Sequence, residues 1–133
     1  MNMKNKLILT AKEALENAYV PYSNFKVGAA LLTKSGKVYS GCNIENSSFS
    51  LACCAERTAI FKAISEGEIE LISMAVIADT EGPVSPCGAC RQVMTEFFTS
   101  DAQIYLSDLQ GNIMETTVKD LLPYSFSLQE NKN

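Results

Sequence analysis

AERTAIFKAISEG at residues 55–67, ELISMAVIA at 70–78 and CGACRQVMTEFF at 87–98 are the segments that decide the fold. The first has apolar side chains at helical spacing and ends at a glycine, which is typical of a helix with its C-terminal cap. The second is an apolar run of strand length, and the third indicates another helix. Helix, strand and helix in succession predict a crossover connection within a mixed sheet.

The segments on either side extend this sheet. Gly28 lies within an expected strand and indicates that another part of the backbone approaches closely there. The pattern predicts an α/β fold with three layers, α-β-α, around a mixed five-stranded sheet. The outer elements we expect are an amphipathic helix at 5–18, a β-hairpin of strands 25–33 and 37–42, strands at 102–107 and 113–118, and a short turn or helix at 119–122.

Length and charge narrow the class of protein. The chain has 133 residues, which predicts one domain over 1–133. Its net charge of −4 and the lack of a basic run argue against binding to a long nucleic acid. Apolar runs stay far below the ~20 residues of a membrane span, and no secretory signal is recognisable. We therefore expect a cytoplasmic protein that does not bind membranes.

The five cysteines point to metal or redox chemistry, because thiols stay reduced in the cytoplasm. Cys54 precedes one expected helix, and Cys87 and Cys90 lie at the start of the next. Three thiolates with an open fourth position are typical of a catalytic zinc site, and Glu56 is suitably placed to carry protons. The chain has no histidine to offer instead. Taken alone, the Cys87–Cys90 pair is also compatible with redox chemistry or with coincidence.

The chain has nine lysines and two arginines, Arg57 and Arg91, and both arginines adjoin the cysteine motifs. Three thiolates on one Zn²⁺ carry a net charge of −1, which weakens the ion as a Lewis acid. Guanidinium donors to the sulfurs offset that charge, so we expect this role for Arg57 and, less strongly, for Arg91. Cys42 and Cys53 are not needed as ligands and are interpreted as packed or spare thiols.

The spacing fits the all-cysteine variant of the zinc deaminase signature, and the chain resembles the small, homotetrameric cytidine deaminases. The resemblance rests on ordered motifs over nearly the whole length: PYSNFKVGAA at 21–30, GCNIEN at 41–46, CAERTA at 54–59, PCGACRQ at 86–92 and LLP at 121–123. It implies zinc ligation by Cys54, Cys87 and Cys90, with Glu56 as the proton shuttle. The implied reaction is hydrolytic deamination of cytidine and deoxycytidine to uridine and deoxyuridine, in pyrimidine salvage.

The resemblance also implies how the substrate is held. It implies that Asn43 and Glu45 bind the ribose hydroxyls, that Phe25 packs against the pyrimidine and that Ala55 lines the pocket. The resemblance further implies that a neighbouring subunit completes each pocket, and Phe126 resembles the aromatic residue that reaches across. Phe49 aligns where many members have tyrosine. If that hydroxyl group meets the nucleoside in those members, this chain lacks one hydrogen bond, worth about 0.5–1.5 kcal/mol.

Three other readings stay open on sequence grounds. A related zinc deaminase could act on a cytosine-bearing antibiotic or on cytosine in RNA, although Asn43, Glu45 and the lack of a basic patch favour a free nucleoside. A non-catalytic zinc module would usually show a fourth ligand, because four ligands close the coordination sphere. A thiol oxidoreductase would use Cys87 and Cys90 without a metal.

Overall fold

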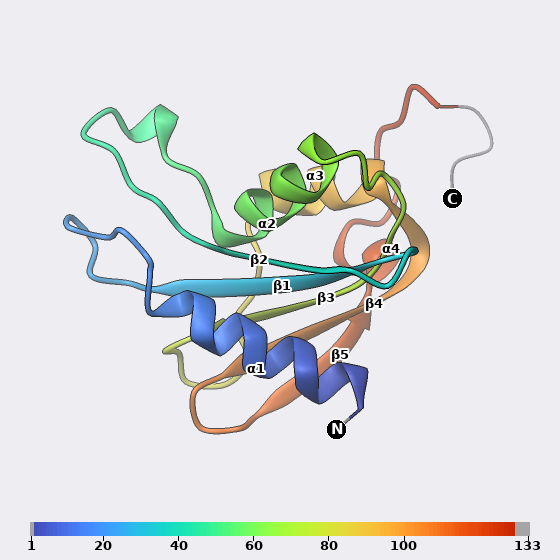
Figure 1. Ribbon diagram of the computed structural model, residues 1–133. Helices are drawn as coiled ribbons and strands as arrows, with labels where there is room; N and C mark the ends of the chain where they lie inside the picture. The colour runs from blue at the N-terminus through green and yellow to red at the C-terminus, as the bar shows by residue number, and fades with distance from the viewer. Residues whose placement is uncertain (1, 130–133) are drawn as a thin grey trace.

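The computed structural model describes residues 2–129, and it places one central sheet between two layers of helices (Figure 1). The helices are α1 (Met3–Leu15), α2 (Ala55–Ser65), α3 (Gly88–Phe97) and the short α4 (Val118–Leu121), with a 3₁₀ turn at Phe49–Leu51. The strands are β1 (Val27–Thr33), β2 (Val38–Cys42), β3 (Leu71–Ala78), β4 (Phe98–Asp108) and β5 (Ile113–Thr117).

The sheet has five strands in the order β2-β1-β3-β4-β5. Strands β3 and β4 run parallel and are joined through α3, while the pairs β1–β2, β1–β3 and β4–β5 are antiparallel. The predicted α/β fold with a mixed five-stranded sheet is therefore confirmed. The crossover from β3 through α3 to β4 brings the start of α3 to the carboxyl end of β3, the kind of edge where ligands gather in α/β proteins.

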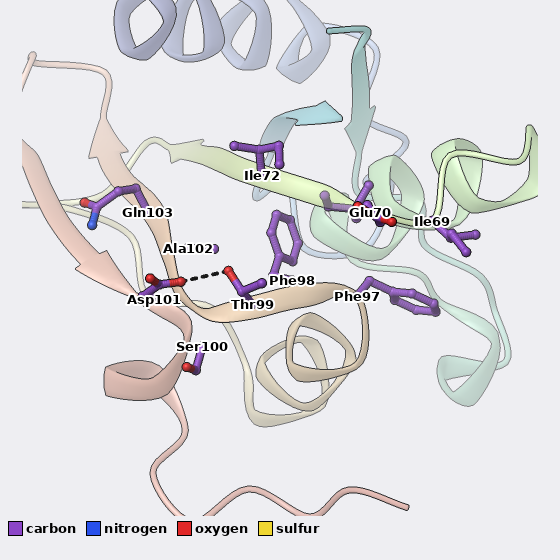
Figure 2. Close-up of a pocket in the computed structure, with 11 residues that line it drawn as sticks. Ile69, Glu70, Ile72, Phe97, Phe98, Thr99, Ser100, Asp101, Ala102 and Gln103 are labelled. Carbon is purple, nitrogen blue, oxygen red and sulfur yellow. Dashed lines mark hydrogen bonds between the residues drawn. The ribbon is translucent and has the colours of Figure 1, made fainter. Parts of the chain in front are cut away.

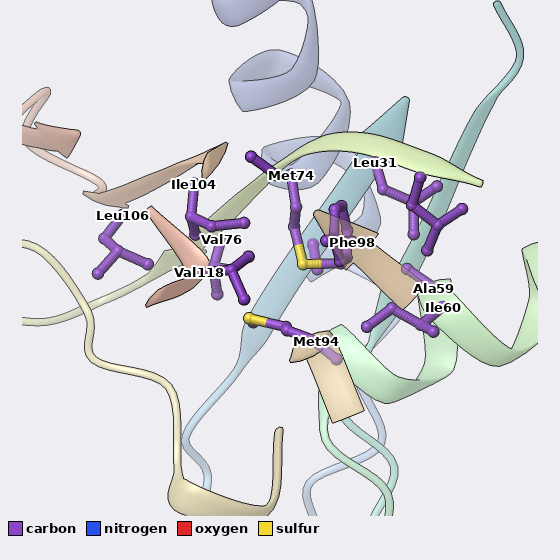
Figure 3. Packing of buried hydrophobic residues seen from close by; sticks show 14 of the residues in the cluster. Leu31, Ala59, Ile60, Met74, Val76, Met94, Phe98, Ile104, Leu106 and Val118 are labelled. Carbon is purple, nitrogen blue, oxygen red and sulfur yellow. The ribbon is translucent and has the colours of Figure 1, made fainter. Parts of the chain in front are cut away.

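The two faces of the sheet carry separate cores. Helix α1 covers one face, where Leu7, Ala11 and Leu15 pack against Ala30, Ala75 and Ile77. Helices α2 and α3 cover the other face over a larger core (Figure 3). That core includes fully buried Leu31, Ile60, Met74, Met94 and Ile104. Alternate residues of each strand thus serve opposite cores, as the period of two along a strand requires.

Two glycines of the β1–β2 hairpin let the helices lie close to the sheet. A Cβ on Gly28 would lie 2.0 Å from the carbonyl oxygen of Ala11 in α1. A Cβ on Gly41 would lie 2.6 Å from the amide nitrogen of Ala59 in α2. The close approach predicted at Gly28 is confirmed, and Gly41 has the same role on the opposite face.

Strand β4 is longer than the predicted 102–107 because it begins directly at Phe98, at the end of α3. Phe98 is buried, whereas the polar residues 99–101 that follow gave no strand signal. The pairing register shifts there, since Leu71 pairs with Phe98 but Ser73 pairs with Gln103. Among the described residues, no helix is both long enough and apolar enough to cross a membrane.

Candidate metal centre and active site

The starts of α2 and α3 bring the three predicted ligand residues together. Cys54 is the N-cap of α2 and Cys87 is the N-cap of α3, both with extended backbone and neither using its sulfur to cap its helix. Cys90 lies in the first turn of α3 and is fully buried. Helix N-termini carry partial positive charge, which favours the thiolate form of sulfurs placed there.

The three sulfurs fit one metal ion. All three Sγ atoms lie within 4.8 Å of one another, and Cys54 Sγ lies 3.8 Å from Cys87 Sγ. Two sulfurs bound at about 2.3 Å to a tetrahedral Zn²⁺ are about 3.8 Å apart. Three thiols at one point are more typical of a zinc site than of a redox centre, which needs only two. They leave the fourth position of a tetrahedral ion free for water or substrate.

Arg57 supplies positive charge to this set. Its Nη2 donates to Cys54 Sγ at 3.2 Å, and its Nε is buried without an acceptor among the described residues. A hydrogen bond with the Cys90 thiol, and next the one from Arg57, lower the pKa of Cys54 to about 5. The Cys54 contact and burial in turn raise the pKa of Cys90. The contact expected for Arg57 is thus present in the structure.

Glu56 lies in the first turn of α2 and is 4% exposed. Burial raises the pKa of its carboxyl group to about 7, and the charge of Cys54 contributes in the same direction. A carboxyl group with a pKa near neutral can both accept and donate a proton, which is what a general acid–base residue must do. Sequence position alone did not reveal that this carboxyl group is buried.

The remaining cysteines lie apart from the metal centre, as the sequence analysis expected. Cys42 pairs with Gly28 and so belongs to the face that α1 covers. Cys53 accepts a hydrogen bond from Thr58 Oγ1 at 3.5 Å. Neither cysteine belongs to the group of three thiols found among residues 2–129.

The second arginine differs from expectation. Arg91 donates from Nε to Pro86 O at 2.8 Å, from Nη1 to Leu121 O at 2.8 Å and from Nη2 to Ser85 Oγ at 2.6 Å. Its guanidinium group is therefore bonded to oxygens around the start of α3, and the weaker expectation of a bond to the ligand sulfurs is corrected. Its position one residue after Cys90 directs the long side chain back over the preceding loop.

Asn43 and Glu45 hold the segment that carries Phe25. Asn43 donates to Phe25 O at 2.7 Å and accepts from Val27 N at 2.9 Å. The Glu45 carboxylate accepts from the backbone of Tyr22 at 3.0 Å and from the hydroxyl and backbone of Ser23, and the Ser23 hydroxyl lowers its pKa. These partners were missed from the sequence, where residues 21–24 indicated only a turn.

A hollow of about 360 Å³ lies beside Glu45 and is lined by Tyr22, Ser23, Glu45, Asn46, Phe49 and Ala52. Phe25, at 41% exposure, is accessible near this segment, and Ala55 is buried at the start of α2. Phe126 is 68% exposed, and its backbone oxygen accepts from Gln92 Nε2 at 2.9 Å. Of the substrate-binding residues expected from the sequence, Glu45 is the one that lines this hollow.

A second, larger hollow, of about 770 Å³, lies at the opposite end of β3 (Figure 2). It is formed where β3 and β4 begin and is lined by apolar side chains such as Ile69, Ile72 and Phe97. Two of its polar groups, Thr99 and Asp101, are bonded to each other at 2.8 Å. Convergent thiols and a buried carboxyl group, rather than cavity size, therefore identify the candidate site.

Comparison with known proteins agrees with this geometry. The family model of the cytidine and deoxycytidylate deaminase zinc-binding region matches residues 1–106. Curated cytidine deaminases from Sporosarcina psychrophila and Halalkalibacterium halodurans are 59% and 56% identical, over 94% and 96% of this chain and 92% and 96% of theirs. The crystal structure of cytidine deaminase from Burkholderia pseudomallei is similar with a TM-score of 0.91 and 50% identity, over 95% of this chain and 100% of that one.

Proposed function

This chain belongs to the cytidine and deoxycytidylate deaminase family, and from that premise we propose the reaction that its site performs. The protein acts as a hydrolase that converts cytidine and deoxycytidine to uridine and deoxyuridine with release of ammonia. The observation that carries the proposal is the group of Cys54, Cys87 and Cys90 beside the buried carboxyl group of Glu56.

Cys54, Cys87 and Cys90 would hold Zn²⁺, and Arg57 would offset the excess negative charge of the three thiolates. When bound, zinc supplies Lewis-acid activation of water at neutral pH. Cys90 and Glu56 are buried, and low exposure to water strengthens the electrostatic contacts made by these two side chains. The metal would thus be held by residues at the starts of two helices that pack on the sheet.

Glu56 moves the protons. Its carboxylate accepts a proton from the attacking water as the water oxygen bonds to C4 of cytosine, and it delivers that proton to ring N3. It then transfers the second water proton to the amino group, the C4–N4 bond breaks, and ammonia leaves. One carboxyl group acts first as base and then as acid, which its pKa of about 7 suits.

Asn43 and Glu45 are proposed to bind the ribose hydroxyls, with Phe25 against the pyrimidine and Ala55 in the pocket wall. Support comes from the Glu45 carboxylate at the edge of the adjoining hollow. A carboxylate has about four acceptor positions and keeps capacity for a ribose hydroxyl beyond the bonds it already makes. The same two residues would therefore hold the Phe25 segment and the sugar.

We further propose that the chain acts as one domain in a cytoplasmic homotetramer whose pockets are shared between subunits. The exposed aromatic side chains Phe49, Tyr124 and Phe126 support this, because such groups are typical of interfaces. Phe126 would enter the pocket of a neighbouring copy. A role in pyrimidine salvage follows from the proposed substrates and products.

The direct test is ultraviolet monitoring of cytidine and deoxycytidine with zinc-loaded protein. We expect turnover on both nucleosides and none on cytosine within RNA. Glu56→Gln should retain zinc and lose nearly all turnover, whereas Glu13→Gln, a matched change on the exposed side of α1, should behave like the wild type. Turnover close to wild type in Glu56→Gln would contradict the proposed role of Glu56.

A further inference from the structure

Arg91 joins two parts of the chain that are far apart in sequence. Its guanidinium group reaches Ser85 and Pro86 in the loop before α3, and Leu121 at the end of α4. The three acceptors are two carbonyl oxygens and one hydroxyl, and Arg91 forms no salt bridge within residues 2–129. Its planar, fixed set of donors, rather than its charge, therefore matches what surrounds it.

The loop contacts bear on the most exposed metal ligand. Cys90 is fully buried in the packed helix, whereas Cys87 is exposed and directly follows Pro86. A peptide group is planar, so holding the carbonyl oxygen of Pro86 also fixes the direction in which the chain enters Cys87. Arg91 thus limits the movement of the sulfur that has the least packing of its own.

The other contact bears on the C-terminal segment. Helix α4 has four residues, so its last carbonyl groups lack partners within the helix, and Arg91 provides one for Leu121. The next residue of α3, Gln92, holds Phe126 O at 2.9 Å. One turn further on, Glu96 contacts the side chain of Gln129. The C-terminal segment therefore follows the helix that carries two of the metal ligands.

We propose that Arg91 is a positioning residue that locks the Cys87 ligand loop to the base of the C-terminal segment. The metal-binding sulfur and the segment that carries Phe126 are then held as one unit. The effect on the metal rests only on the three thiols, whereas the effect on nucleoside binding rests on the proposed function. Losing the lock should loosen the metal and displace Phe126 together.

The test compares Arg91→Lys, Arg91→Gln and Ser85→Ala in the zinc-loaded protein. Zinc release to a chromophoric chelator is followed, together with KM and kcat for cytidine. Both Arg91 variants should release zinc roughly tenfold faster or more, because loss of an outer partner of a metal ligand typically lowers metal affinity about 10–100-fold. Their KM should rise more than their kcat falls. Ser85→Ala, which removes one of the three bonds, should change both quantities less and in the same direction.

Lys119→Gln removes an exposed positive charge on α4 and serves as the control, with no change expected. Zinc release at the wild-type rate in Arg91→Lys would overturn the proposal, because a positive charge without the guanidinium geometry would then suffice. Wild-type zinc release and wild-type kinetics in both Arg91 variants would also overturn the proposal.

If circular dichroism shows that the Arg91 variants do not fold, the Ser85→Ala variant becomes the test. Unchanged zinc release in Ser85→Ala would then overturn the proposal. If the wild-type protein retains zinc but does not turn over cytidine, the proposed function is refuted. The zinc-release measurements would still decide whether Arg91 positions the Cys87 loop.

Discussion

The two faces of the sheet are covered by helices in the same way but serve different purposes. Each face has a glycine that lets a helix lie against the β1–β2 hairpin, Gly28 for α1 and Gly41 for α2. Helix α1 closes a small apolar core and brings no ligand residue to the metal centre. Helices α2 and α3 close the larger core and also aim their N-termini at one metal centre. Close packing thus gives stability on one face, and both stability and chemistry on the other.

The largest expected difference between the faces concerns their cysteines. Cys90→Ala on α3 removes a buried ligand, so bound zinc and deamination should both fall close to zero. Cys42→Ala changes a thiol on the α1 face and should leave both at wild-type levels. Zinc content by metal analysis and the ultraviolet assay measure the difference. Loss of zinc in the Cys42 variant would show that the face covered by α1 also contributes to metal binding.

The two glycines give a matched pair of packing variants. Gly28→Ala places a Cβ against the Ala11 carbonyl group and should lower the free energy of unfolding by about 3 kcal/mol or more. Gly41→Ala displaces the first turns of α2 and should cost roughly 2–3 kcal/mol. Only the Gly41 variant should also release zinc faster, because Cys54 is the N-cap of α2.

Denaturant titration and the chelator assay, both under conditions where the two glycine variants are folded, test this pair. Equal acceleration of zinc release in both variants would show that the α1 face also positions the metal ligands.

The last expected effect is the pH dependence that Glu56 adds to the α2 face, and it is comparable in size to the effect of Gly41→Ala. Burial raises its pKa to about 7 from 4.5, so the folded, metal-free chain binds a proton that the unfolded chain releases in this range. The wild type should therefore lose stability relative to Glu56→Gln as pH rises from 4.5 to 7, by on the order of 3 kcal/mol in total. Denaturant titrations of both metal-free proteins at several pH values measure the slope. A constant difference between the two proteins would contradict it.

Sequence predicted most of what depends on local pattern. The apolar run at 70–78 and the helical spacing of 55–66 identified the crossover, and the cysteine spacing identified the three thiols that lie together in the fold. It did not predict that β4 begins at Phe98, because polar residues 99–101 interrupt the apolar pattern, and the place of Phe98 is set by its pairing with Leu71 of β3. Strand pairing of this kind is a property of the folded sheet rather than of the segment.

The second arginine shows the same limit within the site. Arg57 and Arg91 have similar positions relative to their cysteines, and the charge argument gave both the same role, less strongly for Arg91. In the fold, Arg57 contacts Cys54 and Arg91 contacts Leu121, thirty residues away along the chain. Where a long side chain finds its acceptors depends on which segment the topology brings beside it. That information is not contained in the motif.

The placement of the ligands on two helix starts has a consequence for how the protein folds. Cys87 and Cys90 come together with the first turn of α3, so a newly made chain can capture a metal ion through two thiols early. Cys54 lies 33 residues before Cys87, and β3, which lies between them in the sequence, is placed between β1 and β4 in the sheet. We expect the third metal–sulfur bond to form last, once β3 is in place. We expect the metal to slow unfolding of the central strand, as a late cross-link would.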